Sequence, residues 1–480
     1  MENNEVALLK ELFESYTGKK VALIVPITGS GSNRKYYRLS EGNTSLVGVA
    51  GHSIDENKAF VKLASHFKSK GLPVPQLLAV STDYSCYLQE DLGDVSLFSL
   101  IQQQPESIHF LLKKTISKLA EFQFVGAQGL DFSICYPQSE FDRRTIAWDL
   151  NYFKYCFLKI SGIEFEENKL EDNFEELATL LLTKSTQTFL YRDFQSRNVL
   201  IKDGEPYFID FQGGRKGTVY YDVVSFLWQA RAQFPDTLKN ELLEEYWVTL
   251  SSFIPIDRQE FYSRLPYFVL FRTLQVLGAY GFRGYQEKKA LFIESIPLAI
   301  ANLSRLIHEN DFSTIPYLKA VLEQLVVQPQ FQYRNNQEGL EIRIHSFSYK
   351  RGIPEDYSGN GGGYVFDCRS IHNPGRYQEY RSLTGLDQAV IDFLEQQGDA
   401  LAFMQLVYQL ADQHIQCYLE RGFNQLMFAF GCTGGQHRSV YCAQQLAQYI
   451  RGKYPVKVVV VHREQGFTSS STRTCPYSIR

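Results

Sequence analysis

A short polar segment in the middle of the chain constrains the fold more than any other feature. Asp193 stands five residues before Asn198, and a hydrophobic run ending in Asp210 follows shortly afterwards. An isolated pair at this spacing would usually only cap turns, but the third polar group at the end of a strand makes a kinase-like arrangement. Phosphoryl transfer needs a carboxylate that accepts a hydroxyl proton and oxygen ligands for a divalent metal. We therefore predict that Asp193 is the catalytic base and that Asn198 and Asp210 bind Mg2+.

Two arginines, Arg192 and Arg197, flank the predicted base. A guanidinium in such a place could stabilise the charge on the transferred phosphoryl group, or it could anchor the loop. The pattern assigns both residues to the catalytic segment and leaves the two roles open.

The chain is long enough for more than one domain. It has 480 residues, 44% of them hydrophobic and 21% charged, with no apolar run long enough to cross a bilayer and no signal peptide. Its eight cysteines are scattered without CxxC pairs, which is typical of a reduced, cytoplasmic protein. The formal net charge of -4 argues against general attraction to nucleic acid or to a membrane.

The first two thirds of the chain predict two lobes. Residues 21–28, 36–39 and 45–50 are apolar runs typical of strands, and one helix is expected at residues 57–70. From about residue 94 onward, the pattern is mostly helical. We therefore predict an α+β bilobal, protein-kinase-like fold at residues 1–325, with a small β-rich lobe at about residues 1–93 and a helical large lobe at about 94–325.

A second domain is predicted after a linker at residues 326–340, where Gln, Asn and Pro accumulate. Strand patterns at residues 341–349, 364–368, 426–430 and 456–461 alternate with helical patterns at 387–421 and 439–450. This order predicts an α/β sandwich at residues 341–480, with the last fifteen residues poorly ordered.

Six sequence blocks resemble the aminoglycoside phosphotransferase-like kinases over roughly residues 10–320. Within that family they are most similar to AmgK-type kinases, which phosphorylate the cell-wall amino sugars N-acetylmuramate and N-acetylglucosamine. The blocks are SNRKYYRL at 32–39, LQEDLG at 88–93, RDFQSRN at 192–198, IDFQ at 209–212, YDVVS at 221–225 and LQVLG at 274–278. The resemblance implies a cytoplasmic kinase that uses ATP and Mg2+ and takes a sugar or amino sugar as acceptor.

The same resemblance implies a nucleotide site in the small lobe. The tip of the first predicted hairpin would cover the phosphates, the backbone near residue 90 would contact adenine, and Asp222 would brace the catalytic loop through buried hydrogen bonds. The residues concerned are Gly29, Ser30, Gly31, Ser32, Asn33 and Lys35 for the phosphates, and Gln89, Glu90 and Asp91 for adenine.

One departure from many kinases lies in the strand at residues 45–50, which has no lysine for the α- and β-phosphates. Lys35, Lys58 or Lys62 could replace it, or the loop could suffice. The alternative is a regulatory or adapter protein with a catalytically weak kinase fold.

A second anion signature lies in the C-terminal domain, where a strand runs into a glycine-rich turn that opens a helix. Backbone amides and the positive end of a helix bind anions at such a turn, and Arg438 could add a fork of donors. A tight turn without a ligand is the alternative. The predicted phosphate-binding residues are Cys432, Thr433, Gly434, Gly435, Gln436, His437, Arg438 and Ser439.

This domain resembles the C-terminal domain of RapZ, an RNase adapter protein, over about residues 341–465. The blocks are SFSYKRGIP at 346–354, FDCR at 366–369, NP at 373–374, LTGLD at 383–387, GCTGGQHRS at 431–439 and HR at 462–463. The resemblance implies binding of a sugar phosphate or nucleotide, with Arg351 among the ligands, and self-association. RNA binding is also a family property, but Lys and Arg barely outnumber Asp and Glu beyond residue 338, which does not support it.

A different chemistry fits the same loop. Cys432 and Arg438 are separated by five residues and followed by Ser439, which is also the C-x5-R-[ST] pattern of thiolate phosphatases. No histidine precedes the cysteine. Phosphatase activity is therefore the weaker alternative for this domain.

Overall fold

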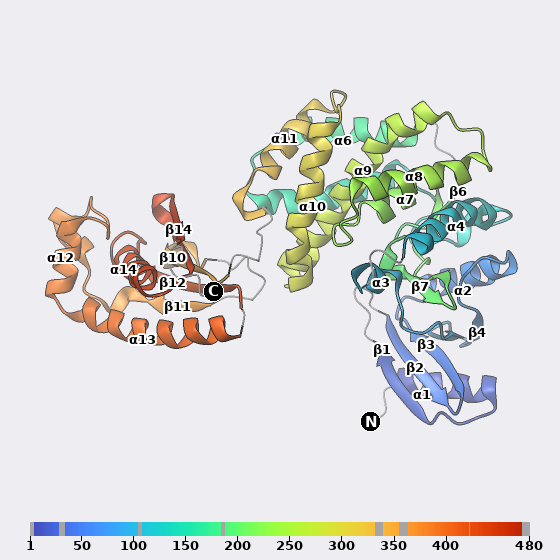
Figure 1. Cartoon of the computed structure of the whole chain (residues 1–480), viewed down its shortest axis with the longest axis horizontal. Helices are drawn as coiled ribbons and strands as arrows, with labels where there is room; N and C mark the ends of the chain where they lie inside the picture. Colours follow the sequence, from blue (N-terminus) through green and yellow to red (C-terminus); the bar gives the residue numbers. More distant parts are fainter. Residues whose placement is uncertain are drawn as a thin grey trace, which may run out of the picture. The chain divides into compact units, whose positions relative to one another are not determined.

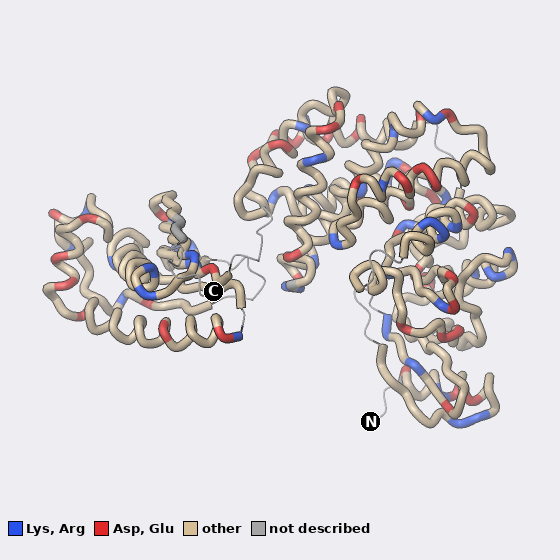
Figure 2. Tube along the Cα trace, in the orientation of Figure 1, with Lys and Arg blue, Asp and Glu red and all other residues tan. Residues whose placement is uncertain are grey.

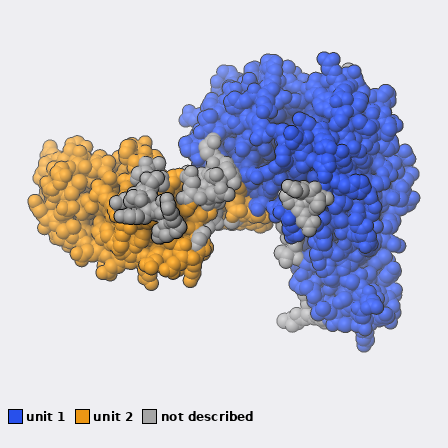
Figure 3. Space-filling view, viewed as in Figure 1, with its two compact units in different colours: residues 1–282, 295–332 blue, residues 283–294, 333–480 orange. Residues whose placement is uncertain are grey.

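The computed structural model describes residues 4–27, 34–103, 108–183, 188–331, 339–354, 363–421 and 423–472. The chain divides into two compact units, residues 1–282 with 295–332 and residues 283–294 with 333–480 (Figure 3). Each unit has its own five-stranded sheet.

The small lobe of the first unit is an antiparallel sheet in the order β1-β2-β3-β5-β4 (Figure 1). Its elements are α1 (Asn4–Thr17), β1 (Leu23–Ile27), β2 (Lys35–Glu41), β3 (Thr44–Ala50), α2 (Ile54–Ser69), β4 (Leu77–Val80) and β5 (Cys86–Glu90). The expected hairpin of β1 and β2 is present. Its tip at residues 28–33 lies outside the described residues.

Two helices accompany this sheet, where sequence patterns predict only one. The additional helix α1 packs Leu9 and Phe13 against Leu39 and Leu88 in one buried cluster. Gly48 permits this approach, because a Cβ atom there would lie 2.6 Å from a methyl group of Leu39. One face of the sheet is thereby sealed by α1.

The large lobe is helical, with two short two-stranded sheets. Its helices are α3 (Leu97–Gln103), α4 (His109–Ala127), α5 (Arg143–Phe153), α6 (Glu167–Leu182), α7 (Tyr220–Leu227), α8 (Asp236–Ser251), α9 (Arg258–Gly281), α10 (Ala290–Glu309) and α11 (Pro316–Val326). The strands are β6 (Thr188–Leu190), β7 (Val199–Lys202), β8 (Glu205–Phe208) and β9 (Arg215–Gly217). At the crossing of α5 and α9, a Cβ on Gly278 would lie 2.8 Å from the Phe153 nitrogen, so this position requires glycine.

The second unit has a mixed sheet in the order β11-β12-β10-β13-β14, in which only β14 is antiparallel to its neighbour. Its elements are β10 (Glu341–Ser348), β11 (Tyr364–Asp367), α12 (Gln388–Gln396), α13 (Asp399–Glu420), β12 (Gln425–Cys432), α14 (Arg438–Lys453), β13 (Lys457–His462) and β14 (Phe467–Thr472).

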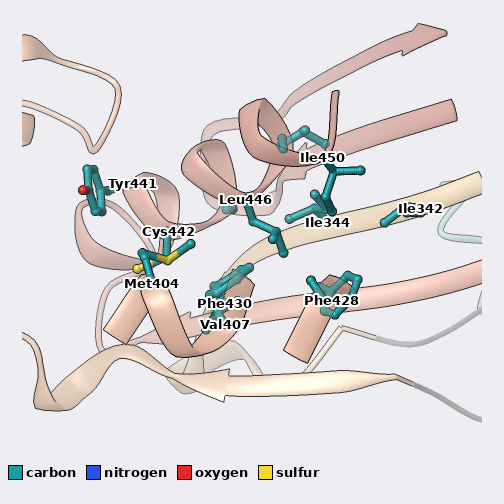
Figure 4. Packing of buried hydrophobic residues seen from close by; sticks show 14 of the residues in the cluster. Ile342, Ile344, Met404, Val407, Phe428, Phe430, Tyr441, Cys442, Leu446 and Ile450 are labelled. Atoms are coloured by element: carbon teal, nitrogen blue, oxygen red, sulfur yellow. The ribbon is translucent and has the colours of Figure 1, made fainter. Parts of the chain in front are cut away.

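One face of this second sheet packs on all three helices. Ile344, Phe428 and Phe430 from the strands meet Met404 of α13 and Leu446 of α14 in a single buried core (Figure 4). The alternation of side chains along each strand sends every second residue into this layer. The result is the predicted α/β sandwich.

Two local predictions in this unit are wrong. The helical pattern at residues 387–421 is broken by Gly398, whose φ of 79° is left-handed and separates α12 from α13. In the C-terminal segment expected to lack order, Phe467–Thr472 form β14, which pairs with β13, whereas residues 473–480 lie outside the described residues. Backbone hydrogen bonds to β13 give residues 467–472 a regular strand structure, although their sequence is rich in Ser and Thr.

One helix of the described chain is long and apolar enough to cross a membrane by length and composition alone. It is the segment Leu291–Glu309 of α10, and 39% of its most apolar window is buried. Buried Ile296, Ala299, Ile300 and Leu303 recur at helical spacing on one face. Core helices pass the same test, so the segment is weak evidence for a membrane span.

Candidate functional site

The predicted catalytic residues lie on a loop and a hairpin of the large lobe. The loop follows β6 and passes through Asp193 to Asn198, where β7 begins. A tight turn at Asp203 and Gly204, both with left-handed φ, joins β7 to β8 and returns the chain. The Ile209 amide then donates to the Asn198 carbonyl at 3.0 Å, which brings Asp210 beside Asn198.

Asp193, Asn198 and Asp210 converge in the structure. The Asn198 side-chain amide donates to the Asp193 carbonyl oxygen at 2.8 Å and to Asp210 Oδ2 at 3.4 Å. The Asp193 carboxylate is half exposed, with Arg272 Nη2 3.8 Å from its Oδ1. A half-exposed carboxylate, Asp193, therefore stands near a partly buried one, Asp210, an arrangement that suits a base beside a metal ligand.

The electrostatics of Asp210 suit a bound cation. Burial raises the pKa of its carboxyl, the negative charge of Asp193 raises it further, and a hydrogen bond from Gln212 opposes both. Mg2+ is commonly held by one or two carboxylates together with phosphate oxygens. The carboxylate of Asp210 and the amide oxygen of Asn198 fit this role, and no cluster of three His, Cys, Asp or Glu side chains in the described chain offers another metal site.

A buried carboxylate fixes the catalytic loop from behind. Asp222 accepts hydrogen bonds from the backbone amides of Tyr191 at 2.8 Å and Arg192 at 2.9 Å, and from Gln123 at 3.0 Å. The phenol of Tyr191 donates to the Ile209 carbonyl, which ties the loop to the strand that carries Asp210. The expected bracing role of Asp222 is confirmed by these contacts.

The two flanking arginines have different environments. Arg192, at a φ of 81°, donates from both terminal nitrogens to Asp149 on α5, at 2.9 and 2.8 Å. Its side chain therefore anchors the loop rather than facing the acceptor. Arg197 is exposed, and its charge lowers the pKa of Asp210.

The predicted adenine-binding residues lie at the end of β5. The backbone of Gln89 pairs with Val47 of β3, and Glu90 forms an ion pair with Lys202 at 2.8 Å. The Asp91 carboxylate accepts from Arg38 and from Ser45. These side chains hold the edge of the small lobe, and contact of their backbone with adenine stays a prediction.

The predicted phosphate contacts of the small lobe are only partly described. Gly29, Ser30, Gly31, Ser32 and Asn33 lie outside the described residues. Lys35 forms an ion pair with Glu5 of α1 at 2.7 Å, on the face of β2 that α1 covers. The structure therefore does not place its ammonium on the face that carries Tyr36 and Arg38.

Sequence reasoning missed Arg34, which lies one residue before β2. Its guanidinium is buried and forms an ion pair with Glu56 of α2 at 2.5 Å. The alternation of β2, with apolar Tyr37 and Leu39 facing α1, was the available signal that Arg34 faces the other way from Lys35.

The predicted anion loop of the second unit lies at the carboxyl edge of its parallel strands. The ends of β10 and β12, neighbouring parallel strands, lie side by side at this edge, and ligands commonly bind at the carboxyl ends of parallel strands. Thr433 and Gly434 are exposed there, and Ser348 at the end of β10 donates to the Thr433 carbonyl at 2.7 Å.

Most side chains of this loop are used to build it. The Cys432 sulfur is buried, accepts from the Gly435 amide at 3.2 Å and contacts the Ser439 hydroxyl at 3.1 Å. Gln436 donates to the carbonyls of Arg381 and Leu383. The His437 Nε2 lies 2.8 Å from the carbonyl of Tyr380.

Arg438, predicted to add a fork of donors to the anion site, uses part of that fork within the domain. Its Nη1 donates to the carbonyls of Arg369 and Ile371, both at 3.0 Å, because these carbonyls of a loop distant in sequence need a donor. Its Nε is buried with no hydrogen-bond partner in the described chain. Arg351 is exposed and pairs with Glu464 at 3.1 Å, so it stands beside the loop.

Comparison with known proteins identifies both units. Residues 24–253 match the phosphotransferase enzyme family, and residues 340–466 match the RapZ C-terminal domain. Each of the two units thus contains a segment that matches a known family. The predicted resemblances to these two families and the predicted fold classes are confirmed.

Curated relatives cover only a part of the chain. A nucleotide-binding protein of Xylella fastidiosa (strain 9a5c) is 39% identical over 125 residues, which are 26% of this chain and 41% of that protein. One of Lactobacillus helveticus (strain DPC 4571) is 41% identical over 123 residues, again 26% of this chain and 40% of that protein. The chain thus spans about two fifths of the length of these relatives.

Solved structures align with about two thirds of the chain. The choline kinase LicA of Streptococcus pneumoniae is 13% identical, with 63% of this chain and 100% of that chain covered and a TM-score of 0.43. A Plasmodium vivax ethanolamine kinase is also 13% identical, with 64% and 83% covered and a TM-score of 0.40.

Proposed function

We propose that the protein is an ATP- and Mg2+-dependent phosphotransferase for the hydroxyl group of a small sugar or amino sugar of the N-acetylmuramate or N-acetylglucosamine kind, acting in the cytoplasm in recycling of the cell wall. The catalytic domain spans residues 1–325, a linker spans 326–340, and the second domain spans 341–480. The observation that carries the proposal is the convergence of Asp193, Asn198 and Asp210.

Each residue of this group has a defined task. The half-exposed carboxylate of Asp193 accepts the proton of the acceptor hydroxyl while the hydroxyl oxygen attacks the γ-phosphorus. The bond between the γ-phosphorus and the β,γ-bridging oxygen breaks, and ADP leaves. Asp210 and Asn198 would hold Mg2+, which would supply positive charge to neutralise the triphosphate. Asp222 and Asp149 hold the loop in place through its backbone amides and Arg192, so that the base needs no rearrangement before reaction.

A screen of acceptors tests the proposal. Full-length protein with ATP and Mg2+ is given free sugars, amino sugars and amino alcohols, and release of ADP is measured. We expect acceptor-dependent ADP release with an amino sugar, and a loss of about 100-fold or more in the Asp193→Asn variant. If nucleotide binds but no acceptor stimulates ADP release, the regulatory alternative replaces this proposal.

The second domain is proposed to bind a phosphorylated sugar or nucleotide at the carboxyl edge of its sheet. Three features support this: the exposed Thr433 and Gly434, the N-terminus of α14, and the buried Arg438 Nε without a partner in the described chain. Self-association of the chain is a further proposal from the family resemblance. RNA binding is not proposed, since Lys and Arg are mixed with Asp and Glu over the second unit (Figure 2).

Calorimetry on the full chain tests the anion site. Hexosamine phosphates are compared with the free hexosamines in the Asp210→Asn variant, which weakens the kinase site. Heat with the phosphate esters only is the expected result, and no heat with any of them would sink the proposal. Release of inorganic phosphate by the wild type but not by Cys432→Ser would instead establish the phosphatase alternative.

A further inference from the structure

Arg34 is a buried cation on the inner face of the small lobe. Side chains alternate along a strand, and Lys35, Tyr37 and Leu39 occupy the face that α1 covers. Arg34 therefore lies on the other face, with only 7% of its surface exposed. Burial of a guanidinium is costly, so a charge kept at this place requires partners of opposite charge.

Two elements hold the guanidinium of Arg34. Its Nη2 pairs with Glu56 Oε1 of α2 at 2.5 Å, and its Nη1 donates to the Tyr87 hydroxyl of β5 at 3.4 Å. The guanidinium also lies over the ring of Phe60, 5.9 Å from its centre. Contacts from both α2 and β5 fix the position of the charge.

The same cluster reaches the metal-binding end of the catalytic hairpin. Phe60 stacks on Tyr87 at 4.7 Å and on Phe211 at 5.0 Å, and Phe211 directly follows Asp210. Arg34 and Phe211 therefore contact the same aromatic side chain, Phe60, which places the guanidinium on the side of the small lobe that faces the hairpin of the predicted Mg2+ ligand.

The lysines considered from the sequence as substitutes for the missing β3 lysine have other partners. Strand β3 contains no Lys or Arg, and Lys35 points to α1. Lys58 lies 3.9 Å from Asp55 and over the Tyr84 ring, and exposed Lys62 lowers the pKa of Asp131. None of the three lysines considered from the sequence has a described contact with the catalytic group.

We propose that Arg34, oriented by Glu56, binds the phosphates of the nucleoside triphosphate and takes the place of the missing lysine of β3. This inference rests on the proposed kinase function. A guanidinium suits the role because its planar fork matches two phosphate oxygens, and because it stays charged when buried. Although Arg34 lies one residue before β2 and not on β3, its guanidinium still pairs with Glu56 of α2.

Binding of nucleotides with different numbers of phosphates tests the proposal. Full-length wild type, Arg34→Met and Arg34→Lys are titrated by calorimetry with adenosine, ADP and the non-hydrolysable analogue AMP-PNP in the presence of Mg2+. We expect Arg34→Met to lose about 10- to 100-fold in affinity for ADP and AMP-PNP and to bind adenosine as the wild type does. Arg34→Lys should regain part of the lost affinity, because it keeps the charge.

Two controls make the test specific. Arg143→Met removes an arginine from an exposed ion pair with Glu175 in the large lobe, and it should leave all three affinities unchanged. Lys58→Met removes the competing cation of α2. If Arg34→Met does not fold, the same three affinities are measured with Arg34→Gln, because the glutamine amide can still donate to Glu56.

The outcomes separate the inference from the proposed function. Three results would overturn the role of Arg34 while leaving the kinase function in place. Arg34→Met could bind ADP as tightly as the wild type does, or it could lose as much affinity for adenosine as for ADP. The third result is a loss of ADP affinity in Lys58→Met instead of in Arg34→Met. A wild type that binds none of the three nucleotides would refute the kinase function itself, and Arg34 with it.

Discussion

Arg192 and Asp149 form a buried ion pair with two hydrogen bonds, which ties the catalytic loop to α5. Burial alone would lower the pKa of the Arg192 guanidinium, but the adjacent Asp149 charge outweighs it and keeps the pKa above its usual value. Because Arg192 sits directly before the predicted base, the pair sets the direction from which Asp193 meets an acceptor.

We predict that Asp149→Ala destabilises the protein strongly. The substitution leaves the guanidinium of Arg192 buried without its partner, which typically costs about 3 to 5 kcal/mol in free energy of unfolding. Urea unfolding of the full chain measures this. The matched control is Glu175→Ala, which breaks the exposed pair with Arg143 and should cost less than about 1 kcal/mol. Equal costs for the two variants would show that the buried pair does not hold the loop.

Replacement of Asp193 and replacement of Asp210 should have different effects on turnover and on nucleotide binding. Asp193→Asn removes the base, so turnover should fall by about 100-fold or more while nucleotide affinity is kept. Asp210→Asn removes a metal ligand, so the dependence of nucleotide binding on Mg2+ should be lost. Titration of ADP with and without Mg2+ distinguishes the two. An Asp193→Asn protein with full turnover would exclude it as the base.

Asp222 gives the protein a defined pH dependence. Burial raises the pKa of its carboxyl to about 6 in the folded state, against the hydrogen bonds from the backbone amides of Tyr191 and Arg192. The folded state therefore keeps a proton that the unfolded state loses near pH 4. Stability falls as pH rises through this window and is level above about pH 6.

The difference in unfolding free energy between wild type and Asp222→Asn isolates this effect. Between pH 4 and pH 6.5, the unfolding free energy of the wild type should fall by about 2 to 3 kcal/mol relative to that of Asp222→Asn. Urea unfolding at several pH values measures the difference, and the other titrating groups cancel in it. A difference that is independent of pH would mean that Asp222 is ionised normally in the folded protein.

The convergence of the predicted catalytic residues could be foreseen because they are near in sequence. Asp193, Asn198 and Asp210 are joined by one hairpin, so their spacing alone nearly determines their geometry. Asp149, by contrast, lies 43 residues before its partner Arg192. Such a pair depends on how α5 packs against the loop, and no local pattern announces it.

Two pairs of observations show why a local motif does not decide how a basic side chain is used. Lys35 and Arg34 are adjacent basic residues, and only the strand face, set by the packing of α1 on Leu39, decides which one is buried. Arg438 fits an anion-binding motif, but two carbonyls of a distant loop compete for its donors. Motifs specify residue types, whereas tertiary contacts decide how each donor is used.

Gly435 of the anion loop should not tolerate a side chain. Its φ of 67° is left-handed, and a Cβ there would lie 2.4 Å from Glu464 Cγ and 2.9 Å from the Ser348 nitrogen. We predict that Gly435→Ala displaces the loop and abolishes binding of hexosamine phosphate while nucleotide binding by the kinase domain is kept. Gly452→Ala is the matched control, since that glycine lies in α14 with open space around it and should gain about 0.5 to 1 kcal/mol. Calorimetry measures the affinities of both variants for hexosamine phosphate and for nucleotide. Unchanged affinity in Gly435→Ala would place the phosphate elsewhere on the second domain, because a loop shifted by this collision cannot present the same amides.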